Sequence, residues 1–238
     1  MSISIFSLLT LGFVLGLKHA LDADHLAAVS TIATERRSLL SSSLVGAFWG
    51  LGHTISLMIA GIFIVLLHLE IGARASKALE FCVALMLIAL GINALWKLIR
   101  GGRIHVHAHE HGDHWHAHPH VHDGKHRDEP HTHHGFKAGA RPLLIGMVHG
   151  MAGSAALTLL VLTTIPSATI GFLYIAIFGI GSIGGMMIMS TLFALPARLT
   201  ALRFARANLA MRGLAGVFTL GFGIFMIYKI GFVDHLLM

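Results

Sequence analysis

The stretch His19-Ala-Leu-Asp-Ala-Asp-His25 places four polar side chains inside an apolar run that opens at Ile3 and continues to Ala33. A helix of about 30 residues is long enough to cross a hydrocarbon core of about 30 Å, and the polar motif falls near its middle. Each charge at that depth costs roughly 2.5–3.5 kcal/mol on insertion scales. A bound cation would offset this cost, so the stretch predicts a metal site within a membrane-spanning segment.

The composition is that of an integral membrane protein. Hydrophobic residues make up 55% of the chain, charged residues only 12%, and the mean hydropathy is +0.77. The formal net charge of +6 does not indicate nucleic-acid binding, because Lys and Arg lie between apolar segments and do not form one basic face. Cys82 is the single cysteine, which excludes a disulfide framework, and we expect it to be a small buried hydrophobe.

Six apolar segments are long enough to span a bilayer, so the predicted fold class is an all-α integral membrane protein with six transmembrane helices. Pro166 and Pro196 are expected to end the fourth and fifth helices. The predicted spans are residues 4–33, 44–67, 79–99, 142–165, 169–195 and 213–232.

Basic residues predict the orientation, because they are concentrated in the first, third and fifth connections. Those connections are therefore expected to be cytoplasmic, with both termini outside and the chain in the inner (plasma) membrane. The opposite side has only Arg74 and Lys77, with Lys229 near the last helix end. The basic residues on the predicted cytoplasmic side are Arg36, Arg37, Arg100, Arg103, Lys125, Arg127, Lys137, Arg141, Arg198, Arg203, Arg206 and Arg212.

The two halves of the chain resemble each other when the second is shifted back by about 130 positions. Gly16-Leu-Lys-His19-Ala then aligns with Gly146-Met-Val-His149-Gly, and Phe48-Trp49-Gly50-Leu-Gly52 aligns near Phe178-Gly179-Ile-Gly181. The third and sixth segments share Leu-Gly, at Leu90-Gly91 and Leu220-Gly221. Because each half has three helices, the second copy must be inverted in the membrane, as in transporters with a site at the midplane. We therefore predict a first three-helix repeat over 1–100, a His-rich loop over 101–140 and a second repeat over 141–238.

Helical spacing selects some of the polar residues of the first segment. At about 100° per residue, His19, Asp22 and His25 lie within an arc of about 120°, whereas Asp24 lies about 100° beyond His25. A local unwinding would bring Asp24 to the same site, so both carboxylates remain candidates. Imidazole and carboxylate ligands suit Ni²⁺, Co²⁺ or Zn²⁺. The alternative is that these residues pair with Lys18 and neighbouring helices as buried polar contacts.

Two further histidines are candidate ligands in other segments. His53 follows Gly50-Leu-Gly52, where small residues allow a neighbouring backbone to come close. His149 takes the place of His19 in the second half and is followed by Ser154. Asn93 is polar at depth, and a hydrogen-bonding role is as consistent with its position as ligation.

The loop contains thirteen of the nineteen histidines. Its low apolar content predicts a disordered tract that captures or buffers metal. The candidate auxiliary ligands in its first part are His105, His107, His109, His111, His114, His116, His118, His120 and His122.

These motifs resemble a known family. The segment from His19 to His25 is similar to the His-x4-Asp-His signature of the nickel/cobalt transporter family, and Leu51-Gly-His53-Thr is similar to its second motif. Gly146-Met-Val-His149-Gly resembles the version found in shorter, six-helix members. The resemblance implies that His19, Asp24 and His25 bind the transported metal and that His53 supports them. It favours Asp24 over Asp22, which helical spacing did not.

We therefore expect a permease that takes up Ni²⁺ or Co²⁺ as its substrate, without a permanently bound cofactor. Its expected partners are the lipid bilayer, the metal ion and a cytoplasmic metallochaperone. An exporter of the same fold is the alternative, since superfamily members with His-rich loops include exporters. A membrane metal buffer that does not translocate is a weaker alternative. Another weaker alternative is a metalloenzyme with Ser154 as nucleophile and His149 as base, because those two residues lie about 140° apart on a helix.

Overall fold

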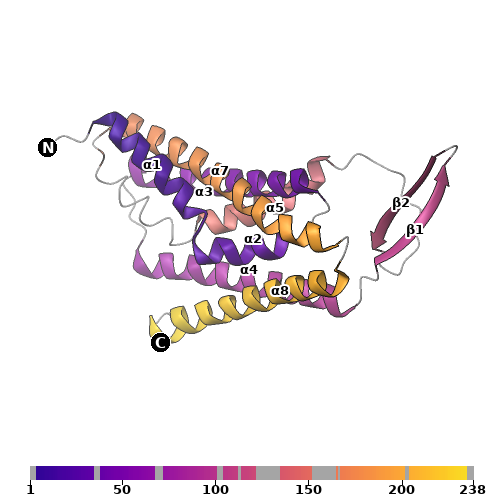
Figure 1. Cartoon of the computed structure of the whole chain (residues 1–238). Coiled ribbons are helices and arrows are strands. Elements are labelled where there is room, and N and C mark those ends of the chain that lie inside the picture. Colours follow the sequence, from indigo (N-terminus) through magenta and orange to yellow (C-terminus); the bar gives the residue numbers. More distant parts are fainter. Residues whose placement is uncertain are drawn as a thin grey trace.

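The chain forms a bundle of membrane helices with a small β-hairpin at one end (Figure 1). The structure, a computed structural model, describes residues 4–34, 38–67, 72–100, 104–111, 114–121, 135–151, 165, 167–201 and 204–234. Its elements are α1 (Ile5–His19), α2 (Ala23–Ala33), α3 (Leu39–Leu67), α4 (Ala73–Ile99), β1 (Ile104–His111), β2 (His114–Val121), α5 (Gly135–Gly150), α7 (Ala168–Ala201) and α8 (Ala205–Tyr228), which ends in a π-helical turn over Lys229–Val233.

Four helices of the described part are long and apolar enough to cross a membrane, namely α3, α4, α7 and α8. The pair α1 and α2 meets the same criterion only when taken together, and the two are bent by 56°. The described residues therefore contain four or five candidate spans, where the sequence predicted six. Most of the predicted fourth span is not described, because residues 152–164 lie outside the described residues.

The break between α1 and α2 divides the first predicted span. Asp22 has an extended backbone and occupies the N-cap position of α2, which Asp favours. Its carboxylate does not cap the helix but contacts the Nδ1 of His19 at 2.8 Å. The polar motif that predicted a metal site therefore also ends one helix and begins the next.

Two helix boundaries near prolines differ from the prediction. Helix α5 begins at Gly135, before Pro142, where the fourth span was expected to open. Helix α7 continues to Ala201 through Pro196, which was expected to end it. Pro166, the other predicted terminator, lies outside the described residues. Proline removes one backbone hydrogen bond, which membrane helices tolerate where neighbouring groups satisfy the freed carbonyl.

The helices pack in pairs, α1 against α7, α3 against both α5 and α7, and α4 against α8. Glycines allow the backbones to approach closely. A Cβ atom at Gly16 of α1 would overlap the carbonyl oxygen of Phe178 in α7, and one at Gly146 of α5 would overlap that of Trp49 in α3. The core at these contacts includes Trp49, Met186 and small residues of α2 such as Ala27 and Ala28.

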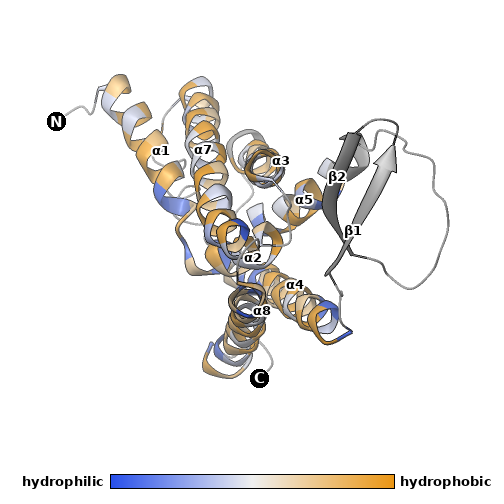
Figure 2. Cartoon of the chain, turned by 45° about the vertical axis from the view of Figure 1, so that its right-hand side comes forward, coloured by the Kyte–Doolittle hydropathy of each residue, from blue (hydrophilic) through white to orange (hydrophobic). Residues whose placement is uncertain are grey.

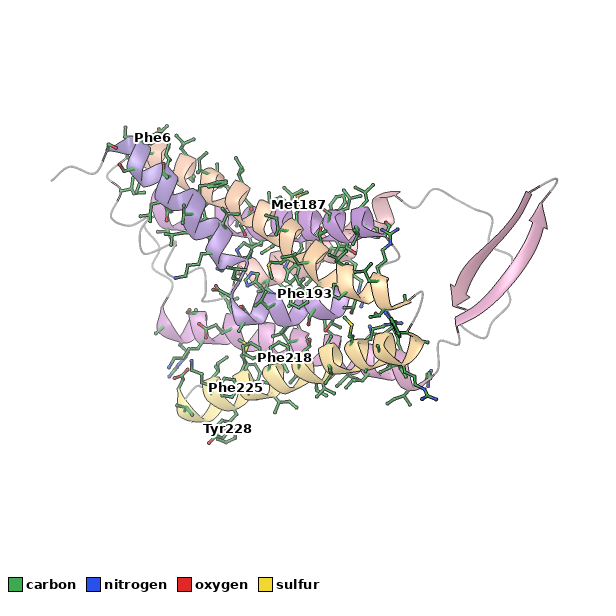
Figure 3. All side chains as sticks on the ribbon, in the orientation of Figure 1. Phe6, Met187, Phe193, Phe218, Phe225 and Tyr228 are labelled. Carbon is green, nitrogen blue, oxygen red and sulfur yellow. The ribbon has the colours of Figure 1, made fainter. Side chains whose placement is uncertain are left out.

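Apolar side chains cover the outside of the bundle. Figure 2 shows long apolar stretches on α3, α4, α7 and α8. Phe218, Phe225 and Tyr228 of α8 and Phe6 of α1 point away from the bundle, and each is at least half exposed (Figure 3). Such a surface suits lipid contact. Cys82 belongs to this exposed set, so the prediction that it is buried was wrong.

The hairpin is a difference from the predicted disorder of residues 101–140. Strands β1 and β2 pair antiparallel, with Ile104 opposite Val121 and His111 opposite His114. Residues 122–134 lie outside the described residues, so disorder in that part of the loop stays a prediction.

Candidate metal centre

The break between α1 and α2 brings four polar residues of one short segment to the centre of the bundle. His19 ends α1, Asp22 occupies the N-cap position of α2, and Asp24 and His25 lie in the first turn of α2. Because the two helices meet at an angle, the spacing of a regular helix no longer applies. Asp24 therefore reaches the same centre as the histidines, which a straight helix would not allow.

Two other helices supply one buried histidine each. His53 comes from α3 and His149 from α5. His25, His53 and His149 have no exposed surface, and His19 is only 6% exposed. The structure thus brings all six predicted residues of the helical segments into one cluster.

One part of the cluster contains only imidazoles. His19, His25 and His53 each offer a ring nitrogen within 4.8 Å of the others. The Nε2 atoms of His19 and His53 are 3.0 Å apart. The ring centroids of His19 and His25 are 4.5 Å apart. This three-histidine group could hold a metal ion.

A second part of the cluster includes a carboxylate. Asp24 lies between two rings, with Oδ1 3.1 Å from Nδ1 of His25 and Oδ2 2.9 Å from Nε2 of His149. Asp24, His25 and His149 also offer ligand atoms within 4.8 Å of one another. His25 belongs to both groups, so the two candidate positions are neighbours that share one imidazole.

The hydrogen-bond partners assign the ring tautomers. A carboxylate only accepts hydrogen bonds, so His19 and His25 donate from Nδ1 to Asp22 and Asp24. Each of these rings then has a lone pair on Nε2. Since His19 Nε2 accepts, the contact at 3.0 Å requires His53 to donate from its own Nε2. Two imidazoles therefore already present the unprotonated nitrogen that a metal needs.

Asp22 has a different environment from Asp24. Its side chain is 40% exposed and contacts His19, whereas the side chain of Asp24 is 13% exposed and contacts two histidines. A carboxylate that accepts from the far nitrogen of a ligating histidine orients the ring and raises its basicity. The two carboxylates that the sequence left as alternatives therefore differ in exposure and in the number of histidines that they contact, and each accepts from the Nδ1 of one histidine.

Aromatic rings that the sequence had not marked as site residues line the cluster. The indole of Trp49 stacks on His25 at 5.8 Å with an interplanar angle of 11°, and it lies 5.5 Å from His149. The ring of Phe178 lies 5.6 Å from His19. Trp49 and Phe178 correspond in the predicted repeat, and that correspondence is the signal that could have found them.

The remaining predicted residues lie elsewhere or are not described. Asn93 lines a small cavity with Thr31 and Arg141 and belongs to neither histidine group. Ser154 lies outside the described residues. The loop histidines from His105 to His120 are in the hairpin, and His122 is not described.

Comparison with known proteins identifies the family. Residues 5–232 match the model of the NicO family, described as high-affinity nickel-transport protein. The chain belongs to the NicO family. It is also 40% identical to the urease accessory protein UreH of Bacillus sp. (strain TB-90) over 234 residues, which is 98% of this chain and 96% of the relative. No solved structure matches the chain. Membership in the NicO family confirms the resemblance inferred from the motifs around His19 and His53.

Proposed function

We propose that the chain carries Ni²⁺, and Co²⁺ as a second substrate, across the membrane through the histidine cluster. The observation that carries the proposal is the meeting of His19, Asp24, His25, His53 and His149, from four helices, at one buried point. Buried polar groups at this depth are costly unless they bind or pair. Membership in the NicO family favours transport over catalysis.

The three-histidine group is the first binding position in this proposal. In the hydrogen-bond arrangement described above, His19 and His25 have an unprotonated Nε2, and His53 donates from its Nε2 to His19 across 3.0 Å. A metal ion bound between His19 and His53 would replace that hydrogen bond, so the His53 Nε2 would release its proton on binding. Imidazole ligands suit Ni²⁺, Co²⁺ and Zn²⁺.

Asp24, His25 and His149 form the second position. His25 turns one nitrogen toward Asp24, which leaves its buried Nε2 for the three-histidine group. His25 would bind the ion through Nε2 in the first position and, once its Nδ1 proton has been released, through Nδ1 in the second. The ion would therefore exchange one nitrogen of this ring for the other as it passes between the positions. The charge of Asp24 would offset the charge of the cation in the second position.

We also propose that the two halves are inverted repeats, which is supported by glycine contacts that occur twice. A shift of 130 positions relates Gly16 to Gly146, and a shift of 129 relates Phe178 back to Trp49. Gly16 lies against the carbonyl of Phe178, and Gly146 lies against the carbonyl of Trp49. The same contact is therefore made once from each half.

Three further pairs of contacts follow the same shifts. In two of these pairs, one contact joins α1 to α7 and its equivalent joins α5 to α3. They are Gly181 with Phe13 and Gly52 with Leu143, and Gly185 with Ala20 and Gly150 with Ser56. In the third pair both contacts join α3 to α7, namely Gly50 with Ile183 and Gly179 with Thr54. A two-fold axis through the centre would produce this reciprocity, and chance similarity of glycine-rich helices would not.

The direction of the chain supports six crossings. Ile5 of α1 and the end of α8 lie at the same end of the bundle, and the hairpin lies at the opposite end (Figure 1). An even number of crossings is needed for this. Helix α5 begins at the hairpin end and α7 begins at the other end, so the chain crosses once between them (Figure 1). With the basic connections at the hairpin end, that end is the cytoplasmic side.

Uptake is the direction we propose. The Bacillus relative is named a urease accessory protein, and an accessory role toward an enzyme agrees better with delivery of metal than with its removal. The basic, His-rich end of the bundle would receive the ion on the cytoplasmic side, where a metallochaperone is the proposed acceptor.

Flux into vesicles tests the proposal. Reconstituted wild-type protein should give saturable Ni²⁺ flux, and His25→Ala should abolish it, because His25 belongs to both positions. His68→Ala, which changes a histidine that is neither a predicted ligand nor part of the loop, is the matched control and should retain flux. Absence of saturable flux in the wild type would instead indicate a buffer. In cells, a Ni²⁺ content below that of an empty-vector strain would indicate export.

A further inference from the structure

The β1–β2 hairpin pairs histidine with histidine at every second position. The four cross-strand pairs are His105 with His120, His107 with His118, His109 with His116 and His111 with His114. The alternate pairs are mostly apolar, namely Ile104 with Val121, Val106 with Pro119, Ala108 with Ala117 and Glu110 with Trp115. The eight paired histidines are called the ribbon histidines below.

The register places all ribbon histidines on one face of the hairpin. Successive residues of a strand alternate between its two faces, and directly paired residues share a face. A slip of one residue would set histidine opposite an apolar residue throughout. The histidine-to-histidine pairing is therefore a property of this register and does not follow from the histidine content alone.

The hairpin needs a further source of stability. An isolated two-stranded hairpin is marginally stable at best in water. In the described part of the chain each strand pairs only with the other, and Pro119 lies on an edge strand, where proline is tolerated. The composition of residues 101–140 predicts disorder for the same reason, because it contains too few apolar residues to form a core.

We propose that the four cross-strand histidine pairs are individual chelating units for a divalent transition-metal ion, and that metal binding folds this ribbon. Directly opposite residues have Cβ atoms about 4.5–5.5 Å apart, whereas diagonal neighbours are about 7–8 Å apart. Two opposite imidazoles can therefore bind one ion, and the ion joins the two strands. Binding energy then becomes folding energy, so the tract is disordered without metal and a hairpin with it. The choice of a divalent transition-metal ion rests on the proposed function, whereas the pairing of the histidines rests on the register of the two strands.

Double substitutions distinguish paired sites from a disordered tract. His105→Ala/His120→Ala and His111→Ala/His114→Ala each remove one whole pair. His105→Ala/His114→Ala and His111→Ala/His120→Ala use the same four residues but damage two pairs each. Every variant loses two histidines, so a tract without fixed pairing would lose the same amount of metal in all four.

Equilibrium Ni²⁺ binding to the purified full-length protein is the measurement, with all eight ribbon histidines changed to Ala as the blank. The whole-pair variants should retain about three quarters of the ribbon's Ni²⁺ and the crossed variants about half, because three and two pairs remain. Equal losses in the four variants would overturn the proposal.

Amide hydrogen exchange gives a second readout. Exchange in residues 104–121 should be fast without metal and slowed by Ni²⁺, and slowed less in the crossed variants. No protection by Ni²⁺ would show that the metal does not fold the ribbon. Vesicle flux tests the proposed function separately. If the ribbon histidines do not bind metal in pairs, wild-type Ni²⁺ flux can still be observed. If the wild-type protein shows no flux, Ni²⁺ binding by the ribbon histidines can still be measured.

Discussion

The Nε2 of His149 lies 2.9 Å from the Oδ2 of Asp24, although 125 positions separate the two residues in the chain. The contact joins α5, in the second half of the chain, to the first turn of α2, in the first half. A site of this kind exists only when the two halves are packed together. Movement of one half against the other would therefore change the ligand set of the ion.

Asp24 and Asp22 should respond differently to the same substitution. Asp24→Asn removes the charge between His25 and His149, and we expect Ni²⁺ flux to fall at least about tenfold. Asp22→Asn keeps an oxygen that can accept from His19, so it should lower apparent affinity by no more than about tenfold, as for groups that orient a ligand. Vesicle flux against Ni²⁺ concentration measures both. A larger loss in Asp22→Asn would reverse the proposed roles.

Two glycines of α7 offer a matched test of packing. A Cβ at Gly181 would overlap the carbonyl of Phe13, whereas one at Gly184 meets nothing within 4 Å. Gly181→Ala should destabilise the protein by about 1–3 kcal/mol, as overpacking does. Gly184→Ala should be neutral or slightly stabilising, because alanine favours helix. Thermal unfolding in detergent compares them, and equal midpoints would contradict the close approach of α1 to α7.

Thr219 holds α2 against α8. Its Oγ1 lies 2.6 Å from the Oγ1 of Thr31 and 2.6 Å from the carbonyl oxygen of Ala27. Thr219→Val conserves shape and removes these hydrogen bonds, so stability should fall by about 1 kcal/mol. Thr191→Val is the control, because the Oγ1 of Thr191 donates within α7, to the carbonyl oxygen of Met187. Similar unfolding midpoints for the two variants would show that the contact between helices adds nothing.

The orientation predicts which ends of the bundle react from outside the cell. Single cysteines at Ser38 and Gly72, in a Cys82→Ser background, mark opposite ends. Gly72→Cys should react with a membrane-impermeant thiol reagent in intact cells, and Ser38→Cys only after permeabilisation. The reverse pattern would place both termini in the cytoplasm and the His-rich loop outside the cell.

Much of the helical framework could be predicted from the sequence, because apolar length decides membrane insertion. Helices α3, α4, α7 and α8 overlap four predicted spans. Boundaries were less accurate where the prediction relied on proline. Helix α7 passes through Pro196, since a membrane helix loses only one hydrogen bond there.

The cluster could be predicted in membership but not in arrangement. Charged residues and histidines in apolar segments are recognisable as candidate ligands wherever they lie in the chain, so the sequence indicated His53 and His149. The sequence did not predict the bend of 56°, and therefore it did not predict the position of Asp24. Helical spacing assumes a continuous helix, and the Asp22 backbone interrupts it. Trp49 was missed as a site residue because aromatic residues are common in any membrane core.

The bend also gives the centre an electrical polarity. Helix α1 ends at His19, so the partly negative carbonyl end of its dipole faces the cluster. Helix α2 begins there, and its partly positive amide end is matched by Asp22 at the N-cap position and Asp24 in the first turn. The backbone of α1 thus attracts a cation without placing a formal charge in the bilayer, while the carboxylates remain on the α2 side. An ion at the proposed site would therefore meet an asymmetric field, with peptide dipoles on one side and carboxyl oxygens on the other.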